Sequence, residues 1–383
     1  MNAARRHDRG WRVTTTVALF VAAMSIAHEP VLAQSSREAV DTAQQARVDA
    51  LFTAFAEPGA PGAAVVVARG DSIVFARGYG LADVEQGIGV TPSTSFRLAS
   101  VTKQFTAAAI LTLVEAGKLR LDDRVGDVLD NVPAYARDVR VRHLLAHTSG
   151  IPDYEVLLGS DDGPQLEDRD VLTLLHRAKK LYFPPGTSWR YSNSGYALLA
   201  LIVERVSGES FAQYLRHRVF DRAGMPTAVA HEEGVDTVTN RAYGHSGQSG
   251  AWTRTDQNRT SAVLGDGGIY ASADELAHWS AALAHNAVLS AASFRAATTP
   301  SVLASGEHTS YGFGWFLDSF RGQRRQRHEG DSIGFRTAIQ RYPDVGLTVV
   351  VLVNRGAAPI DALSDGVATI FLDPWRLPET SAS

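Results

Sequence analysis

Short apolar runs typical of β-strands occur near both ends of the chain. Toward the N-terminal end, residues 63–68 and 72–76 form two such runs, and Arg69-Gly70-Asp71 separates them, which predicts a hairpin. After Ser310 the pattern returns to strands, and the sequence at 343–346 predicts a turn between the last two. The strands predicted for this part are Tyr311–Leu317, Gln326–His328, Phe335–Tyr342 and Leu347–Asn354.

Helical spacing of apolar residues dominates most of the chain between these runs. Gly117 and Gly208 stand where two of these helices are expected to stop. The predicted helices are Arg37–Ala56, Ser100–Ala116, Val141–Ala146, Val171–Lys179, Ser194–Val206, Phe211–Phe220, Ala273–Leu283 and Ile360–Phe371. Strands at both ends with helices between them predict an α/β fold of the α+β type. In it, one antiparallel sheet is built from both chain ends and flanked by helices, with a mostly helical inserted subdomain.

The first 33 residues have the pattern of a secretory signal peptide. The positive charges at its start are Arg5, Arg6, Arg9 and Arg12. The apolar run 16–27 follows, and Val31-Leu32-Ala33 places small residues where a signal peptidase reads. This run is too short to span a bilayer. We therefore expect residues 1–33 to be cut off after Ala33 and the protein to be exported, periplasmic or secreted, without stable membrane insertion.

The remaining chain predicts one domain and excludes several functional classes. We expect a single domain at 34–372, with its sheet part at about 40–98 and 305–372, its helical part at about 99–304, and a polar tail at 373–383. With 45% hydrophobic and 20% charged residues, whole-chain disorder is excluded. The net charge of −4 argues against a nucleic-acid partner. The absence of cysteine excludes disulfides, thiolate metal sites and cysteine nucleophiles.

The chain uses lysine sparingly, and one of its lysines lies three residues after a serine. It contains 33 arginines but four lysines, and Lys103 follows Ser100 at the start of a predicted helix, on the same face. A desolvated lysine can lose its proton, whereas arginine stays charged. Lys103 could therefore activate the Ser100 hydroxyl as a nucleophile at a helix N-terminus that favours a developing anion. The alternative is that Ser100 is an N-cap and Lys103 is solvated.

Two further clusters carry side chains suited to catalysis. Tyr191 and Asn193 lie two residues apart where a turn leads into a predicted helix. A tyrosine held between cations can have a lowered pKa and relay protons, and Asn193 could hold a lysine or a substrate amide. The alternative is a helix cap beside core tyrosines. His328 ends a predicted strand next to a glycine-containing segment, where a substrate backbone could approach closely.

Taken in chain order, these clusters resemble the three motifs of the serine β-lactamase and penicillin-binding protein superfamily. The motifs are Ser100-x-x-Lys103, Tyr191-x-Asn193 and His328-Glu329-Gly330. The sequence is most similar to the class C branch, which includes class C β-lactamases, D,D-carboxypeptidases, D-aminopeptidases and related esterases. Stretches 143–150, 267–270 and 311–315 also look like this branch. The resemblance covers roughly residues 40–372 and implies a β-lactamase/transpeptidase-like fold with one catalytic domain.

The resemblance also implies a mechanism. Ser100 would attack a carbonyl and form an acyl-enzyme that water then releases. Lys103 and Tyr191 would share the acid and base work, and Asn193 would hold the lysine. The backbone N–H groups of Ser100 and Asp331 would form the oxyanion hole. The substrate-binding residues would be His328, Glu329, Gly330 and Asp331. No cofactor and no metal are implied.

The third motif departs from the Lys-Thr-Gly form of many relatives. His328 is charged only part of the time at neutral pH, and Glu329 is an anion if ionised. A Glu329 that faces the site would disfavour β-lactams and acyl-D-Ala-D-Ala peptides, and would suit a free amine or a neutral ester. Arg325 or Arg327 could restore a cation, because alternate strand residues share a face. Which of them faces the cleft stays open.

The sequence therefore predicts an exported serine hydrolase that acts on an amide or ester through a serine acyl-enzyme. Its substrate would be a small molecule or peptide: a β-lactam, a D-amino-acid peptide or a small ester. The alternative is a β-lactam-binding sensor or scaffold that acylates without efficient turnover. The oligomeric state stays open.

Two other enzyme classes fit single features of the sequence. His143 and His147 have the spacing of two zinc ligands on a helix, but Leu144 stands where a glutamate is expected and no third ligand is evident. The stretch 330–334 has the Gly-x-Ser-x-Gly spacing of α/β-hydrolases. That motif should lead from a strand into a helix and be followed by a histidine, and no histidine occurs after His328.

Overall fold

The computed structural model describes residues 42–159, 163–232, 234–248 and 250–373. The predicted signal peptide lies outside this part of the chain, as does the polar tail after Asp373. From residue 42 onward, the described residues belong to one compact unit. Within the described ranges, we find no helix with the length and apolar character needed to cross a bilayer.

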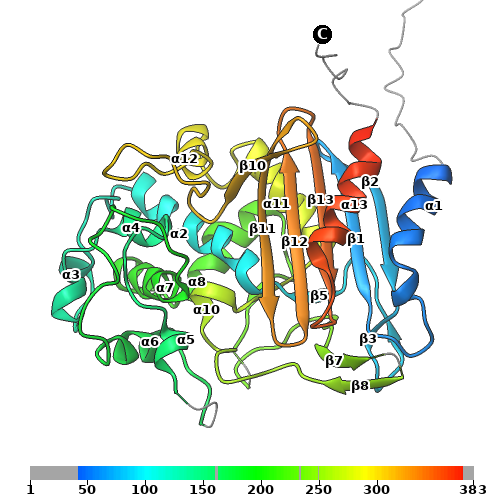
Figure 1. The fold of residues 1–383 in the computed structure, drawn as a ribbon, viewed down its shortest axis with the longest axis horizontal. Helices are drawn as coiled ribbons and strands as arrows, with labels where there is room; N and C mark the ends of the chain where they lie inside the picture. Colours follow the sequence, from blue (N-terminus) through cyan, green and yellow to red (C-terminus); the bar gives the residue numbers. More distant parts are fainter. Residues whose placement is uncertain (1–41, 160–162, 233, 249, 374–383) are drawn as a thin grey trace, which may run out of the picture. The chain divides into compact units, whose positions relative to one another are not determined.

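A six-stranded antiparallel sheet joins the two ends of the chain, which confirms the predicted fold class (Figure 1). Its strand order is β10-β11-β12-β13-β1-β2. The strands are β1 (Ala63–Arg69), β2 (Ser72–Tyr79), β10 (Phe316–Phe320), β11 (Gln323–Ser332), β12 (Phe335–Tyr342) and β13 (Leu347–Val353). The N-terminal and C-terminal segments meet where β1 pairs with β13, from Ala63 opposite Val353 to Arg69 opposite Leu347.

Helices cover both faces of this sheet and give it two hydrophobic cores. On one face lie α1 (Thr42–Leu51) and α13 (Ile360–Leu372), and on the other lies α11 (Ala273–Ala284). Successive strand residues point to opposite faces. Val65 accordingly packs in the core that contains α13, and Val66 packs in the core of α11. This burial explains why β1 and β13 are continuous apolar runs.

The helical part inserts between β2 and β10. Its helices are α2 (Lys103–Glu115), α3 (Val125–Val128), α4 (Val141–Leu145), α5 (Tyr154–Leu157), α6 (Asp168–Leu175), α7 (Asn193–Ser207), α8 (Phe211–Leu215), α9 (Asp221–Ala223), α10 (Leu264–Gly267) and α12 (Ala291–Ala297). Short strands form three smaller sheets: β3 (Leu81–Asp83) with β4 (Ile88–Gly89), β5 (Ser95–Arg97) with β9 (Ile269–Ser272) and β6 (Val229–Ala230), and β7 (His245–Gln248) with β8 (Ala251–Arg254). The buried helices α2 and α7 pack against each other at the centre of this part.

Two predicted boundaries near the catalytic motifs are wrong. The strand expected at Tyr311–Leu317 begins five residues later, because Gly312 and Trp315 close a turn through a backbone hydrogen bond. Gly314 in this turn has φ +79°, and a Cβ atom there would lie 2.7 Å from the carbonyl oxygen of Lys103. The strand expected to end at His328 continues to Ser332. The loop at 311–315 thus packs directly against the start of α2.

Candidate active site

The candidate nucleophile and base lie at the junction of a 3-10 turn and α2. Ser100 belongs to the turn Ala99–Thr102, and Lys103 is the first residue of α2. Lys103 is fully buried, so the expectation of a solvated lysine is excluded. Its Nζ donates to Ser100 Oγ at 3.0 Å and to the carbonyl oxygen of Asp266 at 2.8 Å. Ala99, just before the serine, has φ +50°, a strained conformation of the kind that costs about 1–3 kcal/mol.

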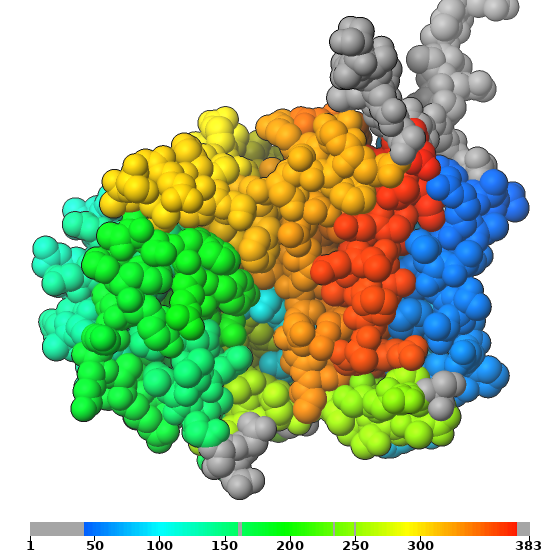
Figure 2. Space-filling model, in the orientation of Figure 1, coloured from blue at the N-terminus to red at the C-terminus, as the bar shows by residue number. Residues whose placement is uncertain are grey.

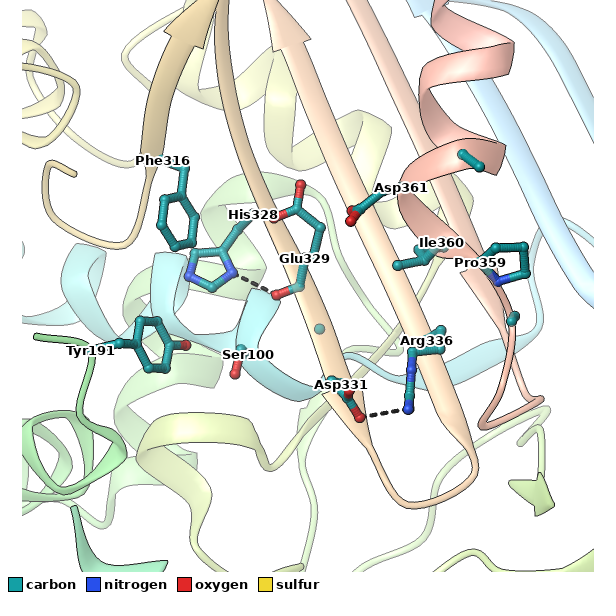
Figure 3. A pocket seen from close by; sticks show the side chains of 13 residues that line it. Ser100, Tyr191, Phe316, His328, Glu329, Asp331, Arg336, Pro359, Ile360 and Asp361 are labelled. Carbon is teal, nitrogen blue, oxygen red and sulfur yellow. Dashed lines mark hydrogen bonds and ion pairs between the residues drawn. The ribbon is translucent and has the colours of Figure 1, made fainter. Parts of the chain in front are cut away.

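Tyr191 faces the same cavity as Ser100 (Figure 3). Lys103 Nζ lies 5.0 Å from the centroid of its ring. Burial raises the pKa of the Tyr191 phenol, while the charge of Lys103 and hydrogen bonding with Lys103 and Ser100 act in the lowering direction. The expectation of a lowered phenol pKa is therefore wrong, because burial outweighs the neighbouring cation. Tyr191 keeps its proton at neutral pH and is suited to donate it.

Asn193 begins α7 and lies beside acidic residues of the helical part. Its backbone N–H donates to Asp153 Oδ2 at 2.6 Å, and its Nδ2 donates to Glu155 Oε1 at 3.1 Å. Its Oδ1 is buried and accepts no hydrogen bond from the described residues. The contact with Lys103 that the resemblance implies is not among the hydrogen bonds of the described residues. The backbone carbonyl of Asp266 accepts from that lysine.

Asp266 also carries a buried side chain next to this lysine. Its Oδ2 accepts a hydrogen bond from the Tyr154 hydroxyl at 3.0 Å. Burial raises the pKa of the Asp266 carboxyl to about 7, and the charge of Lys103 acts in the opposite direction. Sequence reasoning missed this residue, because an interaction made by a backbone carbonyl leaves no side-chain signal.

His328 is buried in the middle of β11 and is held by two hydrogen bonds. Its Nδ1 lies 2.7 Å from the carbonyl oxygen of Glu329, and its Nε2 lies 3.1 Å from the Tyr311 hydroxyl. Burial, together with the charge of Lys103, lowers the pKa of His328 to about 3. The imidazole is therefore neutral, with Nδ1 donating to the carbonyl and Tyr311 donating to Nε2. The expectation that His328 supplies a part-time cation is wrong.

The arginines of β11 do not supply a free cation to the cavity either. Arg327 pairs with Glu329 through its Nη1 and with Asp318 at 2.9 Å. Arg325 pairs with Asp318 at 2.7 Å and with Asp365 at 2.8 Å. Of the two arginines, Arg327 is therefore the one that lies beside Glu329, and carboxylates already neutralise both Arg325 and Arg327. Burial raises the pKa of Glu329, while Arg327 lowers it and Asp361 raises it further.

A cavity of about 670 Å³ opens between Ser100 and the third motif, and Lys103 and Asn193 are not among the residues that line it. Ser100 and Tyr191 line one side of it, and the third motif with Asp331 lines the other. Figure 2 shows cyan atoms from around the Ser100 turn at the bottom of a hollow between the green helical part and the orange strands. Gly330 permits this closeness, since a Cβ atom there would lie 2.2 Å from the carbonyl oxygen of Leu98.

The charges on the cavity wall are mostly negative. Among the lining residues, Glu329, Asp331 and Asp361 are acidic and Arg336 is the basic one. Arg336 pairs with Asp331 at 2.6 Å. Asp361 is exposed at the N-terminal end of α13 and forms no ion pair with the described residues. A ligand here meets carboxylates rather than an unpaired cation on this side of the cavity.

The two competing motifs do not form the sites expected of them. In the described part of the chain, no group of three or more His, Asp or Glu side chains is placed to hold a metal ion. The Nδ1 of His143 accepts from the backbone of Arg140, and that of His147 accepts from the backbone of Ser192. The segment at 330–334 joins strand β11 to strand β12, whereas the α/β-hydrolase motif requires a helix after the serine.

Comparisons with known proteins agree with this geometry. Residues 48–369 match the Beta-lactamase family. A penicillin-binding protein of Bacillus subtilis is 32% identical over 320 residues, which are 80% of this chain and 70% of that protein. A D-aminopeptidase of Brucella canis is 33% identical over 324 residues, or 82% of this chain, which spans 61% of that enzyme.

A solved structure shows the same architecture. The octameric penicillin-binding protein homologue of Pyrococcus abyssi superimposes with a TM-score of 0.74 at 26% identity, covering 86% of this chain and 77% of that one. The motifs, the geometry and these matches lead to the same assignment. The chain belongs to the β-lactamase family, in the class C-related branch of serine hydrolases and penicillin-binding proteins.

Proposed function

We propose that the protein hydrolyses amides of amino acids or short peptides that carry a free amine next to the scissile bond. The observation that carries this proposal is the acidic wall opposite Ser100. Asp361 lines the cavity without an ion pair among the described residues, and Glu329 lines it beside its partner Arg327, while His328 is neutral and Arg336 is paired with Asp331. Such a wall favours an ammonium group and disfavours the carboxylate of a penicillin or of a D-Ala-D-Ala peptide.

The relatives support a preference for D-configured substrates. The matched Brucella protein is named a D-aminopeptidase, and this chain spans 61% of its length. The proposed reaction starts from the form of the site in which the Lys103 amine is neutral: Ser100 Oγ attacks the amide carbonyl while the free electron pair of Lys103 Nζ takes up the hydroxyl proton. Tyr191 then gives its proton to the departing amine nitrogen, and the proton held by Lys103 restores the phenol. Water attacks the ester in the second half and releases the acid.

The test compares D-alanine p-nitroanilide with its N-acetyl derivative, using the full chain. Wild-type protein should have the higher kcat/KM for the free amine. Glu329→Gln should reduce that preference by about tenfold, which is the size expected of one charge-assisted contact. Glu307→Gln removes an exposed carboxylate that does not line the cavity and should leave the preference unchanged.

Other outcomes would overturn the proposal. Equal kcat/KM for the free and acetylated anilides would contradict amine recognition. Fast turnover of a penicillin, with the anilide inert, would make the protein a β-lactamase. A stable penicillin adduct without turnover would favour the sensor or scaffold alternative. L-alanine p-nitroanilide in the same assay tests the preferred configuration.

We also propose that residues 1–33 direct export, on the sequence pattern described above. Expression of the full chain in a bacterium that exports proteins should then yield a product whose first residue is Gln34. Recovery of the protein with its N-terminus at Met1, confined to the cytoplasm, would contradict this proposal.

A further inference from the structure

His147 lies behind Tyr191 at a strained point of the chain. It follows α4 and has φ +57°, in the left-handed region that residues other than glycine rarely adopt. Its side chain is almost fully buried. Backbone strain of this kind persists where the surrounding structure enforces it, and it concentrates at functional sites.

Two hydrogen bonds attach the segment around Tyr191 to this histidine. The carbonyl oxygen of His147 accepts from the backbone N–H of Arg190 at 3.0 Å. Its Nδ1 accepts from the backbone N–H of Ser192 at 3.2 Å. The residues on both sides of Tyr191 are thereby fixed. The imidazole also lies against the phenol, with ring centroids 4.2 Å apart.

The imidazole of His147 is neutral, and its hydrogen bond shows which ring nitrogen carries the proton. Because Nδ1 accepts a hydrogen bond, the proton lies on Nε2. Burial, followed by the charge of Lys103, lowers the pKa of His147 well below its ordinary value. This Nε2 has no hydrogen-bond partner among the described residues. A buried donor without a partner is unfavourable for stability, so stability alone does not explain a histidine here.

The same ring also contacts Tyr311, in the loop before β10. Its centroid lies 4.7 Å from that of Tyr311. The hydroxyl of Tyr311 in turn donates to His328 Nε2. His147 therefore contacts Tyr191 of the second motif directly and His328 of the third through Tyr311. A substitution that changes the size of this side chain would affect both motifs.

We propose that His147 is a positioning residue that holds the Tyr191 phenol where it protonates the leaving group. This inference rests on the proposed function, in which the phenol proton moves to the amine nitrogen as the carbon–nitrogen bond breaks. An amide needs that proton, because an amine anion does not leave. An activated ester does not need it, because p-nitrophenolate is a stable anion. Misplacement of Tyr191 should therefore affect the two substrates differently.

The test measures two substrates in parallel. His147→Phe keeps an aromatic ring but removes the acceptor for the Ser192 N–H. It should lower kcat for D-alanine p-nitroanilide by about 100-fold, the scale of a misplaced acid catalyst, with little change in KM. Turnover of p-nitrophenyl acetate should fall by less than about fivefold. Tyr191→Phe should show the same selectivity for the amide.

Two matched variants control for folding. His147→Asn retains a short acceptor, and asparagine tolerates a positive φ, so it should restore most of the anilide turnover. His143→Asn removes an imidazole one helical turn earlier, outside the candidate active site, and should leave both substrates unchanged. Thermal unfolding of each variant reports whether the fold is retained.

The outcomes separate this inference from the proposed function. Equal losses for amide and ester in His147→Phe, or a His147→Asn variant no better than His147→Phe, would overturn the positioning role. If Ser100→Ala is inactive while His147→Phe keeps its anilide turnover, the inference alone fails. If Ser100→Ala keeps the anilide turnover, the proposed function fails with it.

Discussion

The protonation states of single side chains in this site depend on their surroundings more than on their residue types. Lys103 could be picked out from sequence, because it stands three residues from a serine in a chain with few lysines. The protonation of His328 and Tyr191 could not, because it depends on burial and on the distance to Lys103. Burial moves the pKa of His328 down and that of Tyr191 up. Both groups are consequently neutral around pH 7.

A pH-dependent stability follows from His328. An unfolded histidine titrates near 6.5, whereas His328 in the folded protein has a pKa of about 3. Between these values the unfolded state binds a proton that the folded state does not, so the free energy of unfolding should fall as pH drops from about 6.5 toward 3. The asparagine variant His328→Asn should show a shallower fall between pH 7.5 and 4.5 in denaturant titrations.

An exposed histidine provides the control for this titration. His308 is exposed and forms no ion pair with the described residues, and His308→Asn should keep the wild-type dependence on pH. If His328→Asn and wild-type protein lose stability in parallel as pH falls, His328 is not the neutral buried group described here.

At the level of elements, the site depends on how closely β11 approaches the Ser100 turn. The ladder between β10 and β11 begins at Phe316 opposite Arg327. After Arg327, β11 stays paired with β12 along one edge, and it also packs against the Ser100 turn. The hydroxyl of Thr337 on β12 donates to the carbonyl oxygen of Leu98 at 2.7 Å and fixes this distance. The two backbone N–H groups that the resemblance implies for the oxyanion hole are those of Ser100, in the turn, and Asp331, in β11.

Substitution of Gly330 tests this approach. A Cβ atom would lie 2.2 Å from Leu98 O and 2.3 Å from Thr337 Oγ1, so β11 and the turn must separate. Gly330→Ala should lower kcat/KM by about 100-fold, as expected when oxyanion donors are misplaced. Gly89→Ala, where the nearest atom is 3.9 Å away, should have wild-type activity. Wild-type kcat/KM in Gly330→Ala would show that catalysis does not depend on the close approach of β11 to the Ser100 turn.

Some strands and helices could be predicted from the sequence, and others could not. Long apolar strands such as β1 and β13 and the helices α2 and α7 were predictable, because their periodicity reflects burial. The strands β3 to β9 were missed, since two to four residues carry no measurable period. The strand misplaced at Tyr311 depends on a glycine turn that packs on α2, which is a tertiary constraint.

On the scale of the whole molecule, the active site exists only because distant segments converge. Ser100 comes from the start of the helical part, Tyr191 from its middle, and His328 from the C-terminal half of the sheet. Their order along the chain was enough to suggest the family. The supporting residues Asp266 and His147 were not assigned these roles from sequence, because they act through a backbone carbonyl and through a ring contact.

The most direct test of the account is the intact mass of the protein during turnover of p-nitrophenyl acetate. Rapid quenching of wild-type protein should reveal the mass of one acetyl group, and peptide mapping should place it on Ser100. The Ser100→Ala variant should keep its thermal unfolding transition, gain no such mass and release no product above background. An adduct on another residue, or turnover that survives in Ser100→Ala, would contradict the assignment of Ser100 as the nucleophile.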